Sequence, residues 1–526
     1  MKKKVVATLL GALPMMLMAQ SQSAMDAFSL SQSDLRGTAR FMSMAGAFGA
    51  LGGDLSTLNQ NPGGIGVYRS SEIGFTFDIN MQSTESEAMG VKKSSDQTKV
   101  YCNNFGYVGT VNLNSDIMPT FSWGATYART ASFDRIYRGH VPSLSTSMSN
   151  YVANFTNGWA PGELDNYSTD RYYENPYQDS GAPWLSILSY NSYLINSIGG
   201  TSMYSGLFGN GTYGDALFNI REKGYVDEYS LNFGGNIMNT VYWGIGFGIT
   251  DLDYSIEALY DEQLCDIPSE IPDEYYDGHY ELKNETRITG SGFNFKAGLI
   301  FKPVNELRLG FAIHTPTYYD LQQETWGMIN YDYSVGDFYG TEYTDNGYIS
   351  YYDSKLKTPW RLIASAAGVI GSKGILSFDY EYDAYSDMSV QDEYGDTYTD
   401  IEGDIKNYYQ ASHTIRLGGE YRVTPQFSIR AGYSYKTSPV KNEAADNEEY
   451  IYTVGTNPAY NFENTTQHIT AGLGYRYKGF YVDMAYVYKH RESTWYAFSK
   501  FDMNEAPKAE ITDNNNSLVF SLGYKF

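Results

Sequence analysis

Two arginines near the N-terminus are the first candidates for chemistry. Arg36 and Arg40 are four residues apart in a stretch that is otherwise rich in glycine, alanine and methionine. A guanidinium group binds a carboxylate through parallel hydrogen bonds, so the two arginines could hold the carboxylate of a ligand. They could equally form ion pairs with acidic residues of the protein, such as Asp78, Asp379 and Glu381. We favour internal ion pairs, because buried charges need partners whether or not a ligand is present.

Large apolar side chains follow the arginines. Phe41, Met44 and Phe48 could line an apolar pocket, and flexible methionines suit ligands of varied shape, but ordinary packing explains these residues equally well. A short helix predicted over residues 54–59 must stop before Pro62, because the residue before a proline disfavours the α conformation. The candidate site residues are Arg36, Arg40, Phe41, Met44, Phe48, Asn61, Pro62 and Gly63.

Motifs for catalysis or for cofactor binding are missing from the sequence. The six histidines are not spaced as metal or haem ligands, and neither a Gly-x-Ser-x-Gly nor a His-Glu-x-x-His element occurs. Tyrosine could ligate haem, but 51 tyrosines single out no position. The acid-rich stretch 261–277 could gather divalent cations, although it lacks EF-hand spacing. We therefore predict no enzymatic activity, no cofactor and no metal, and leave open a disulfide between Cys102 and Cys265.

Charge and composition exclude several classes of protein. The 526 residues include 37 Lys+Arg and 61 Asp+Glu, giving a formal net charge of −24, which argues against nucleic-acid binding. The mean hydropathy is −0.41, and beyond the N-terminus no run of ~20 apolar residues could form a transmembrane helix. Residues 1–20 are predicted to be a signal peptide, with three lysines before an apolar run that is too short for a membrane anchor, the alternative interpretation.

In the segments that must position the candidate residues, apolar residues alternate with small or polar ones at a period of two. In residues 72–82, Ile73, Phe75 and Phe77 share one face, while the residues between them are small or polar. Residues 293–301 and 307–313 repeat this pattern on both sides of a turn at 303–306, which predicts a hairpin. A strand that shows lipid one face and a lumen the other must alternate in this way.

Fourteen such runs are predicted to be the strands of a transmembrane antiparallel β-barrel. Short and long connections alternate between them, as the periplasmic turns and outer loops of such barrels do, and this argues against a soluble β-sandwich. The last run ends at Phe526 in an aromatic strand that suits insertion by the barrel assembly machinery. The runs are 72–82, 98–112, 119–134, 224–237, 241–255, 287–302, 305–318, 355–370, 374–387, 408–423, 426–438, 466–478, 480–492 and 515–526.

The region before the first strand does not alternate, and it carries a family resemblance. Its sequence ALGGDLSTLNQNPGGIG, the stretch GFNFKAGLIFKPVNELRLGFAIHTPTYYD and the C-terminal strand resemble the FadL-type outer-membrane transporters. The resemblance implies a fourteen-stranded barrel (72–526) whose lumen is plugged by an N-terminal hatch (21–71). The Asn61-Pro62-Gly63 turn matches the hatch motif of this family, which commonly has alanine in place of Gly63.

The resemblance also implies a function. Such barrels sit in the outer membrane of Gram-negative bacteria as multi-pass proteins and take up hydrophobic small molecules, such as long-chain fatty acids, by passive diffusion. The ligand would pass the hatch and leave laterally through a kink in the strand over 119–134. No proline interrupts that strand, so a bulge would have to make the kink.

The expected partners are outer-membrane lipid and lipopolysaccharide, a hydrophobic ligand and the barrel assembly machinery, with no nucleic acid. The alternative function is a barrel that anchors or shuttles a secreted protein or a surface-assembly partner bound by its loops. A connected apolar pocket beside the hatch, with a lateral gap in the wall, would favour transport. A tightly filled lumen with an exposed loop platform would favour a protein partner.

Overall fold

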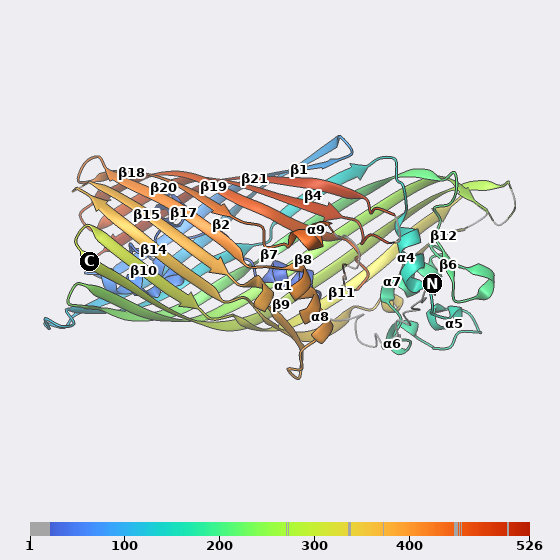
Figure 1. The fold of residues 1–526 in the computed structure, drawn as a ribbon, viewed down its shortest axis with the longest axis horizontal. Helices are drawn as coiled ribbons and strands as arrows, with labels where there is room; N and C mark the ends of the chain where they lie inside the picture. The colour runs from blue at the N-terminus through green and yellow to red at the C-terminus, as the bar shows by residue number, and fades with distance from the viewer. Residues whose placement is uncertain are drawn as a thin grey trace, which may run out of the picture.

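The computed structural model is a closed antiparallel β-barrel (Figure 1). It describes residues 22–269, 271, 273–334, 338–371, 373–446, 451, 453, 455–501 and 504–526, so the predicted signal peptide lies outside the described residues. In this part of the chain, no helix is both long enough and apolar enough to cross a bilayer.

The wall contains fourteen strands, ten continuous and four broken into two segments, which confirms the predicted fold class. Each pairs with its neighbours, and β1 pairs with β21 to close the cylinder. The continuous strands are β1 (Glu72–Ala88), β2 (Val91–Asn112), β7 (Tyr213–Ile237), β8 (Val241–Pro268), β9 (Tyr275–Val304), β17 (Ser412–Arg422), β18 (Phe427–Lys436), β19 (Tyr460–Tyr477), β20 (Phe480–Tyr496) and β21 (Lys508–Lys525). The broken strands are β3/β4 (Thr120–Ser132, Arg135–Val141), β10/β11 (Leu307–His314, Tyr318–Tyr333), β14/β13 (Arg361–Ile370, Ser350–Lys357) and β15/β16 (Gly374–Asp383, Ser389–Asp392).

An apolar belt surrounds the barrel at the end that carries the short turns. Along β9, Phe293, Leu299 and Phe301 are exposed, while the alternate residues Asn294, Lys296 and Gly298 face the lumen. The belt occupies only part of each strand. Short turns mark the periplasmic end of an outer-membrane barrel. Residues 24–30 lie towards the opposite, extracellular end.

Two predicted strands are interrupted at prolines. The strands predicted over 305–318 and 355–370 each break, at Pro316 and Pro359 respectively, and the two breaks lie side by side because Thr358 N donates to Thr317 O at 3.1 Å. Proline has no N–H to give to the ladder, so a wall strand cannot run through it unbroken. The strand predicted over 408–423 begins later, at Ser412, because residues 399–408 form helix α8 (Thr399–Tyr408).

Several strands extend well beyond their predicted outer ends. β8 continues to Pro268 instead of 255, and β9 begins at Tyr275 instead of 287. Above the bilayer the outward face meets water, so apolar alternation stops there although the hydrogen-bonded ladder continues. The extension carries a hairpin strand, β12 (Phe338–Tyr343), paired with β11.

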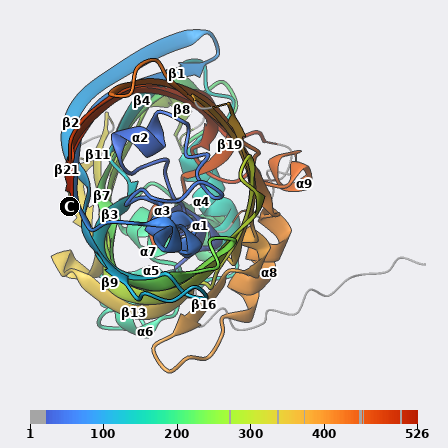
Figure 2. The same cartoon turned by 90° about the vertical axis from the view of Figure 1, so that its left-hand side faces the viewer.

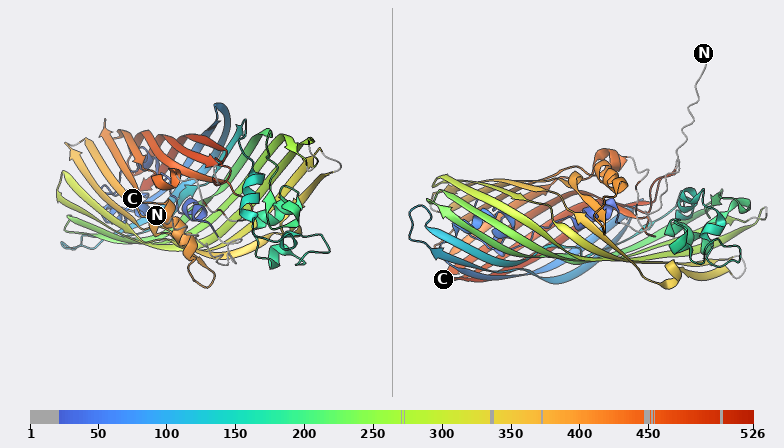
Figure 3. Two further views of the ribbon diagram at one scale, coloured as in Figure 1. Left: turned by 45° about the vertical axis from the view of Figure 1, so that its right-hand side comes forward. Right: turned by 90° about the horizontal axis from the view of Figure 1, so that it is seen from below.

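A folded cap fills the longest connection, residues 142–212, where no structure was predicted. It contains helices α4 (Met148–Thr156), α5 (Pro161–Leu164), α6 (Pro176–Asp179) and α7 (Trp184–Asn191), and a small sheet of β5 (Asn196–Ser197) and β6 (Tyr204–Ser205). Both views in Figure 3 show these helices against the outer ends of the longest strands. Their buried side chains share one core with β7, β8, β9 and β11, in which Trp495 stacks on Phe218 at 3.9 Å.

The remaining elements are short. Residues 22–71, here called the N-terminal segment, form helices α1 (Ala24–Leu30), α2 (Ala39–Met42) and α3 (Thr57–Gln60) and the 3-10 helix η1 (Pro62–Val67). Viewed from the end in Figure 2, α1, α2 and α3 lie within the ring of strands. The outer connections add η2 (Ile198–Gly200), η3 (Thr344–Gly347), η4 (Tyr385–Asp387) and α9 (Asn442–Asp446).

Candidate functional site

The N-terminal segment begins beneath the outer loops. Ser23 and Asp26 form a capping box that starts α1, and burial raises the pKa of the Asp26 carboxyl against these hydrogen bonds. The Phe28 ring stacks on Tyr409 at 4.7 Å and meets the edge of Tyr385 at 5.1 Å. One apolar cluster thus joins α1 to α8 and the loops around it at the outer end of the lumen.

Arg36 lies in the middle of the lumen. Its Nη1 donates to Asn103 Oδ1 at 2.9 Å and lies 3.7 Å from Asp78 Oδ2, and its guanidinium sits 4.6 Å above the Tyr101 ring. Asp78, one of the acids considered as a partner from the sequence, therefore faces this arginine. Arg36 is held by the wall on the side of β1 and β2.

Arg40 faces a different part of the wall. Its Nε donates to Glu420 Oε2 at 3.0 Å, and Glu420 also accepts from Arg430, which in turn donates to Asp483 at 2.5 Å. The guanidinium of Arg40 stacks over the Phe48 ring at 5.1 Å. Arg36 and Arg40 are thus not brought together at one ligand, because each has its own acidic partners on different strands.

The apolar candidates pack as a small core below the two arginines. Phe41 and Phe48 lie 5.7 Å apart, and Met44 is fully buried against the wall glycines Gly418 and Gly432. Phe41 also borders the larger of the two cavities described below. Met44 and Phe48 line neither cavity described below, which favours a packing role for them.

Asp379, which projects inward from β15, fixes the backbone after this core. Its Oδ2 accepts from Phe48 N at 3.0 Å, from Gly49 N at 2.8 Å and from Gln60 Nε2 at 3.1 Å. Three donors from the N-terminal segment therefore converge on one wall carboxylate. Such charge-assisted hydrogen bonds are stronger than neutral ones.

The Asn61-Pro62-Gly63 turn forms the floor of the lumen. Asn61 Oδ1 accepts from Gly63 N at 3.0 Å, and its Nδ2 donates to Gly49 O at 2.6 Å, so the side chain ties the turn to the preceding core. A Cβ on Gly63 would lie 2.9 Å from the Gly298 carbonyl in β9. Glycine therefore lets this backbone approach the wall more closely than alanine would allow.

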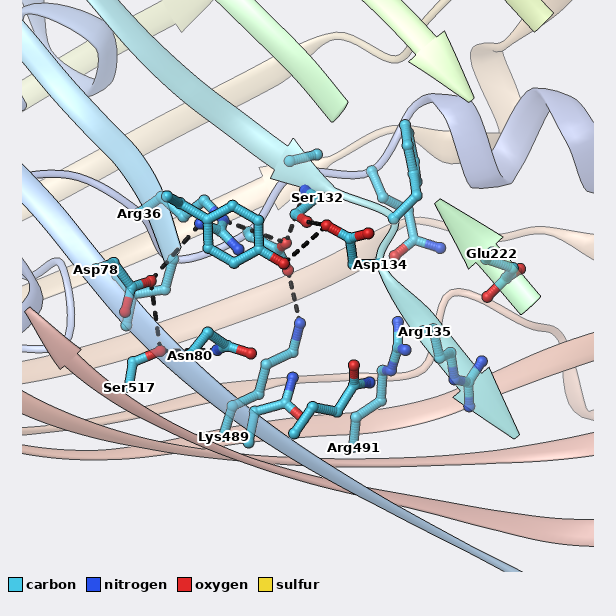
Figure 4. Close-up of a pocket in the computed structure, with 18 of the residues that line it drawn as sticks. Arg36, Asp78, Asn80, Ser132, Asp134, Arg135, Glu222, Lys489, Arg491 and Ser517 are labelled. Atoms are coloured by element: carbon cyan, nitrogen blue, oxygen red, sulfur yellow. Dashed lines mark hydrogen bonds and ion pairs between the residues drawn. The ribbon is translucent and has the colours of Figure 1, made fainter. Parts of the chain in front are cut away.

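Two adjoining cavities lie between the N-terminal segment and the wall. The larger, of about 200 Å³, reaches from Arg36 to His314 and Arg416, and the smaller, of about 110 Å³, contains the residues drawn in Figure 4. Gln32, Asp34, Leu35 and Arg36 line both. Eight lysine or arginine side chains and only four acidic ones line the larger cavity, so it is basic although the protein is acidic.

The stretch of residues 32–36, which borders both cavities, is held in place by ion pairs. Asp34 Oδ1 accepts from Lys489 Nζ at 2.6 Å, and its Oδ2 lies 3.7 Å from Arg36 Nε. Burial alone would raise the pKa of the Asp34 carboxyl, but the two cations outweigh it and hold the pKa well below its usual range. Asp34 is therefore charged, and the stretch is pinned to β20.

The hydrogen-bonded ladder of the wall is interrupted beside the larger cavity. The ladder between β2 and β3 ends at the pair Asn104–Ala128, and within the described residues the outer part of β2 pairs only with β1. β3 continues along β7 with a bulge between Arg129 and Ala131. We call this interruption the wall break. Because Asn104 pairs with Thr76, it lies at the level of the apolar belt.

Side chains cross the wall break where the backbone does not. Tyr101 OH donates to Asp134 Oδ2 at 2.8 Å, and Lys99 Nζ lies 3.2 Å from Asp134 Oδ1. Higher up, Arg138 donates to Ser94 O at 3.0 Å. The bulge between Arg129 and Ala131 in β3, a strand segment that contains no proline, accompanies the interruption. These side-chain hydrogen bonds and ion pairs can break without the loss of any ladder hydrogen bond.

Several residues of this site were not singled out from the sequence. Glu420, Lys489 and Asp134 lie at lumen-facing or loop positions, and strand alternation alone could have placed the first two inside the barrel. Cys102 and Cys265 are free thiols. In the described ranges, no group of three or more histidine, cysteine or acidic side chains is placed to hold a metal ion.

Comparisons with known proteins agree with this architecture. A family model described as "Outer membrane protein transport protein (OMPP1/FadL/TodX)" matches residues 236–526. No curated protein sequence matches the chain.

Solved structures share the fold at low sequence identity. A Pseudomonas aeruginosa FadL homologue is 13% identical and aligns over 94% of this chain and 99% of its own, with a TM-score of 0.52. A deltaS2 mutant of the TodX monoaromatic hydrocarbon channel is also 13% identical, over 94% of this chain and 100% of its own, with a TM-score of 0.51. Because the family model covers more than half of the chain, this outer-membrane β-barrel belongs to the OMPP1/FadL/TodX family of transport proteins.

Proposed function

We propose that the protein takes up hydrophobic molecules with an anionic head, of the long-chain fatty acid class, by passive diffusion. The N-terminal segment acts as the hatch, and the ligand leaves sideways through the wall break. The observation that carries the proposal is the larger cavity, which extends to Asn104, Ala128 and Thr130 at the wall break. A ligand there lies next to the only interruption of the ladder between β2 and β3 among the described residues.

The lining of the cavities supports an amphipathic ligand. An apolar pocket is the expected sign of transport, whereas the larger cavity mixes Phe41, Tyr319 and Ile363 with many charged side chains. Lys436 is the cation best placed for a ligand carboxylate, because its Nζ contacts Tyr385 OH at 3.1 Å and no carboxylate within 4.0 Å among the described residues. An acyl chain would lie along the apolar side chains.

Removing the bulge tests the lateral exit. Deleting Thr130 puts Arg129 and Ala131 in regular register with β7, which should draw β3 towards β2 and close the wall break. We expect uptake of a fluorescent dodecanoate to fall to the level of cells that lack the protein. Thr130→Ala keeps the extra residue and should leave uptake unchanged.

A heat-modifiable band on an electrophoresis gel shows that each variant has folded. If the folded Thr130 deletion takes up dodecanoate at the wild-type rate, the lateral exit is wrong. If wild type itself takes up no more dodecanoate than cells without the protein, the proposed ligand class is wrong.

The alternative function, binding of a secreted or surface-assembly partner through the loops, is favoured by the folded cap. The cap exposes Tyr167, Tyr172, Ile198 and Met203 above the barrel. If transport is the function, replacing these four residues by serine should leave dodecanoate uptake unchanged. A loss of surface protein without a loss of uptake would support the partner role.

A further inference from the structure

The periplasmic mouth carries a run of basic side chains. Along the short turns between β14 and β20, residues 367–376, 421–428 and 474–481 contain four basic residues and no acidic one. Arg308 and Lys525 extend the run on either side. We call these six residues the basic arc: Arg308, Lys373, Arg422, Arg476, Lys478 and Lys525.

The basic arc follows successive strands of the wall. β10, β14, β15, β17, β18, β19, β20 and β21 are neighbours in that order. Neighbouring turns are in direct contact, since Arg422 N donates to Lys373 O at 2.8 Å and Arg476 N donates to Gln426 O at 2.9 Å. The cations therefore lie on neighbouring turns of one rim, where Glu306 is the acidic residue of the turn that precedes Arg308.

Most of these charges have no acidic partner. Among the described residues, Arg308, Lys373, Arg422, Arg476 and Lys478 lie in no ion pair, and only Lys525 meets a carboxylate, that of Glu72 at 3.0 Å. Deeper in the lumen the opposite holds, and Arg40, Arg416 and Arg430 are each paired with an acid. In a chain with 24 more acidic than basic residues, a surplus of cations at one rim makes a local positive field that attracts anions.

Strand alternation directs much of the arc towards the barrel axis. Arg422 lies on the same face of β17 as Glu420, which contacts Arg40 in the lumen, while its neighbour Tyr421 faces outward. Arg476 likewise lies between the exposed tyrosines Tyr475 and Tyr477. Lipid headgroups of the inner leaflet meet the outward tyrosines, so the inward cations are placed for a water-soluble partner.

The mouth inside the arc is closed. Arg308 Nη1 donates to Leu51 O at 2.7 Å, and Lys525 Nζ donates to Gly53 O at 3.4 Å, so both tie the N-terminal segment to the rim. A Cβ on Gly66 would lie 2.3 Å from Gly235 O, which leaves no room between the floor and β7. The cations thus surround a floor that is bound to the rim at these positions, which suits docking from the periplasm.

We propose that the basic arc is a docking surface for an acidic segment of a water-soluble periplasmic protein. Complementary charge speeds the encounter and orients the partner under the barrel, and it gives a contact that salt weakens. The complex would bring a soluble protein to the periplasmic side of the barrel, beneath the floor.

An oligoglutamate peptide with a fluorescent label is the probe. Full-length protein in nanodiscs of zwitterionic lipid should bind it. The variant Lys373→Gln, Arg422→Gln, Arg476→Gln, Lys478→Gln should bind it about tenfold more weakly, if each contact contributes as exposed ion pairs do. The variant should also show a shallower dependence of affinity on salt.

Four exposed cations at the other end of the barrel provide the matched control. Lys92→Gln, Lys93→Gln, Arg287→Gln and Lys406→Gln together remove the same charge from the extracellular side and should leave peptide binding within about twofold of wild type. Equal loss in both fourfold variants, or no loss in the rim variant, would overturn the proposal.

Nanodiscs that contain phosphatidylglycerol test whether lipid headgroups, instead of a protein, occupy the basic arc. If this lipid abolishes peptide binding, and native mass spectrometry finds it retained by wild type but not by the rim variant, headgroups occupy the basic arc and the proposal is wrong. If peptide binding persists in these nanodiscs, a protein partner is supported. Dodecanoate uptake is measured separately, so the two proposals fail independently.

Discussion

At the scale of single residues, wall carboxylates hold the N-terminal segment in place. Asp379 is the clearest case, because the backbone N–H groups of Phe48 and Gly49 have this carboxylate as their acceptor. Glu420 plays a similar part for Arg40. The segment thus depends on acids that project from β15 and β17, more than 300 residues away in the sequence.

Replacing Asp379 by alanine should loosen the core of the N-terminal segment. The change leaves the buried Gly49 N–H without an acceptor among the described residues and leaves Phe48 N–H with the Gly46 carbonyl alone, at 2.9 Å. Losing a hydrogen bond to a charged group should cost about 1–3 kcal/mol. We expect faster hydrogen exchange at Phe48 and Gly49, measured by mass spectrometry. The barrel should still give its heat-modifiable band.

Asp353→Ala is the control for this prediction. Asp353 lies on the outer face of β13 and accepts from Gln322 at 3.1 Å, away from the N-terminal segment. Its removal should not alter exchange at Phe48 or Gly49. Unchanged exchange in the Asp379 variant would show that other contacts hold the segment.

At the scale of elements, the floor is the part most sensitive to side-chain size. The 3-10 helix η1 packs along β7, β8 and β9 through glycine backbones, and Gly244 lies so close to Pro62 that its own Cβ would reach the Pro62 carbonyl. Position 63 is glycine here, whereas FadL-type transporters commonly have alanine at this position. The close approach of Gly63 to Gly298 explains this difference.

Gly63→Ala should push the floor away from β9. The new Cβ meets backbone atoms, which cannot rotate aside, so overpacking should cost about 1–3 kcal/mol. We expect faster exchange at Gly64 and Ile65 and a higher leak of a small dye into proteoliposomes.

Gly403→Ala in α8 adds a methyl group into open space and serves as the control. It should alter neither the exchange nor the leak. A Gly63 variant that behaves as wild type in both measurements would mean that the floor can shift without cost.

At the scale of the whole molecule, the last residue closes the cylinder. Phe526 N donates to Ser71 O, and Ser71 N donates to Phe526 O, both at 3.0 Å, so the C-terminus completes the ladder between β21 and the start of β1. The Phe526 ring also stacks on Tyr524 at 5.8 Å in the periplasmic aromatic belt.

Removing Phe526 should therefore impair assembly. The variant loses two ladder hydrogen bonds and the terminal aromatic ring, and we expect less heat-modifiable barrel in the outer-membrane fraction. Phe526→Tyr retains the ring and the backbone, so it should assemble as wild type. Full assembly of the truncated chain would contradict a role for the terminal residue in insertion.

The sequence by itself determined the strands that face lipid. Runs such as 72–82 and 293–301 alternate because each residue there meets either acyl chains or the lumen, and this constraint is local. The count of fourteen strands followed from the same signal. The N-terminal segment was recognised by its lack of alternation, and its candidate residues lie inside the barrel.

Only the tertiary structure decided what those residues contact. The partner of Arg40 is Glu420, 380 residues away, and no local pattern distinguishes Glu420 from the other inward acids. The outer halves of β8 and β9 were missed because water on the outer face removes the apolar alternation. Contacts across a closed barrel depend on the register of every strand, which local sequence does not record.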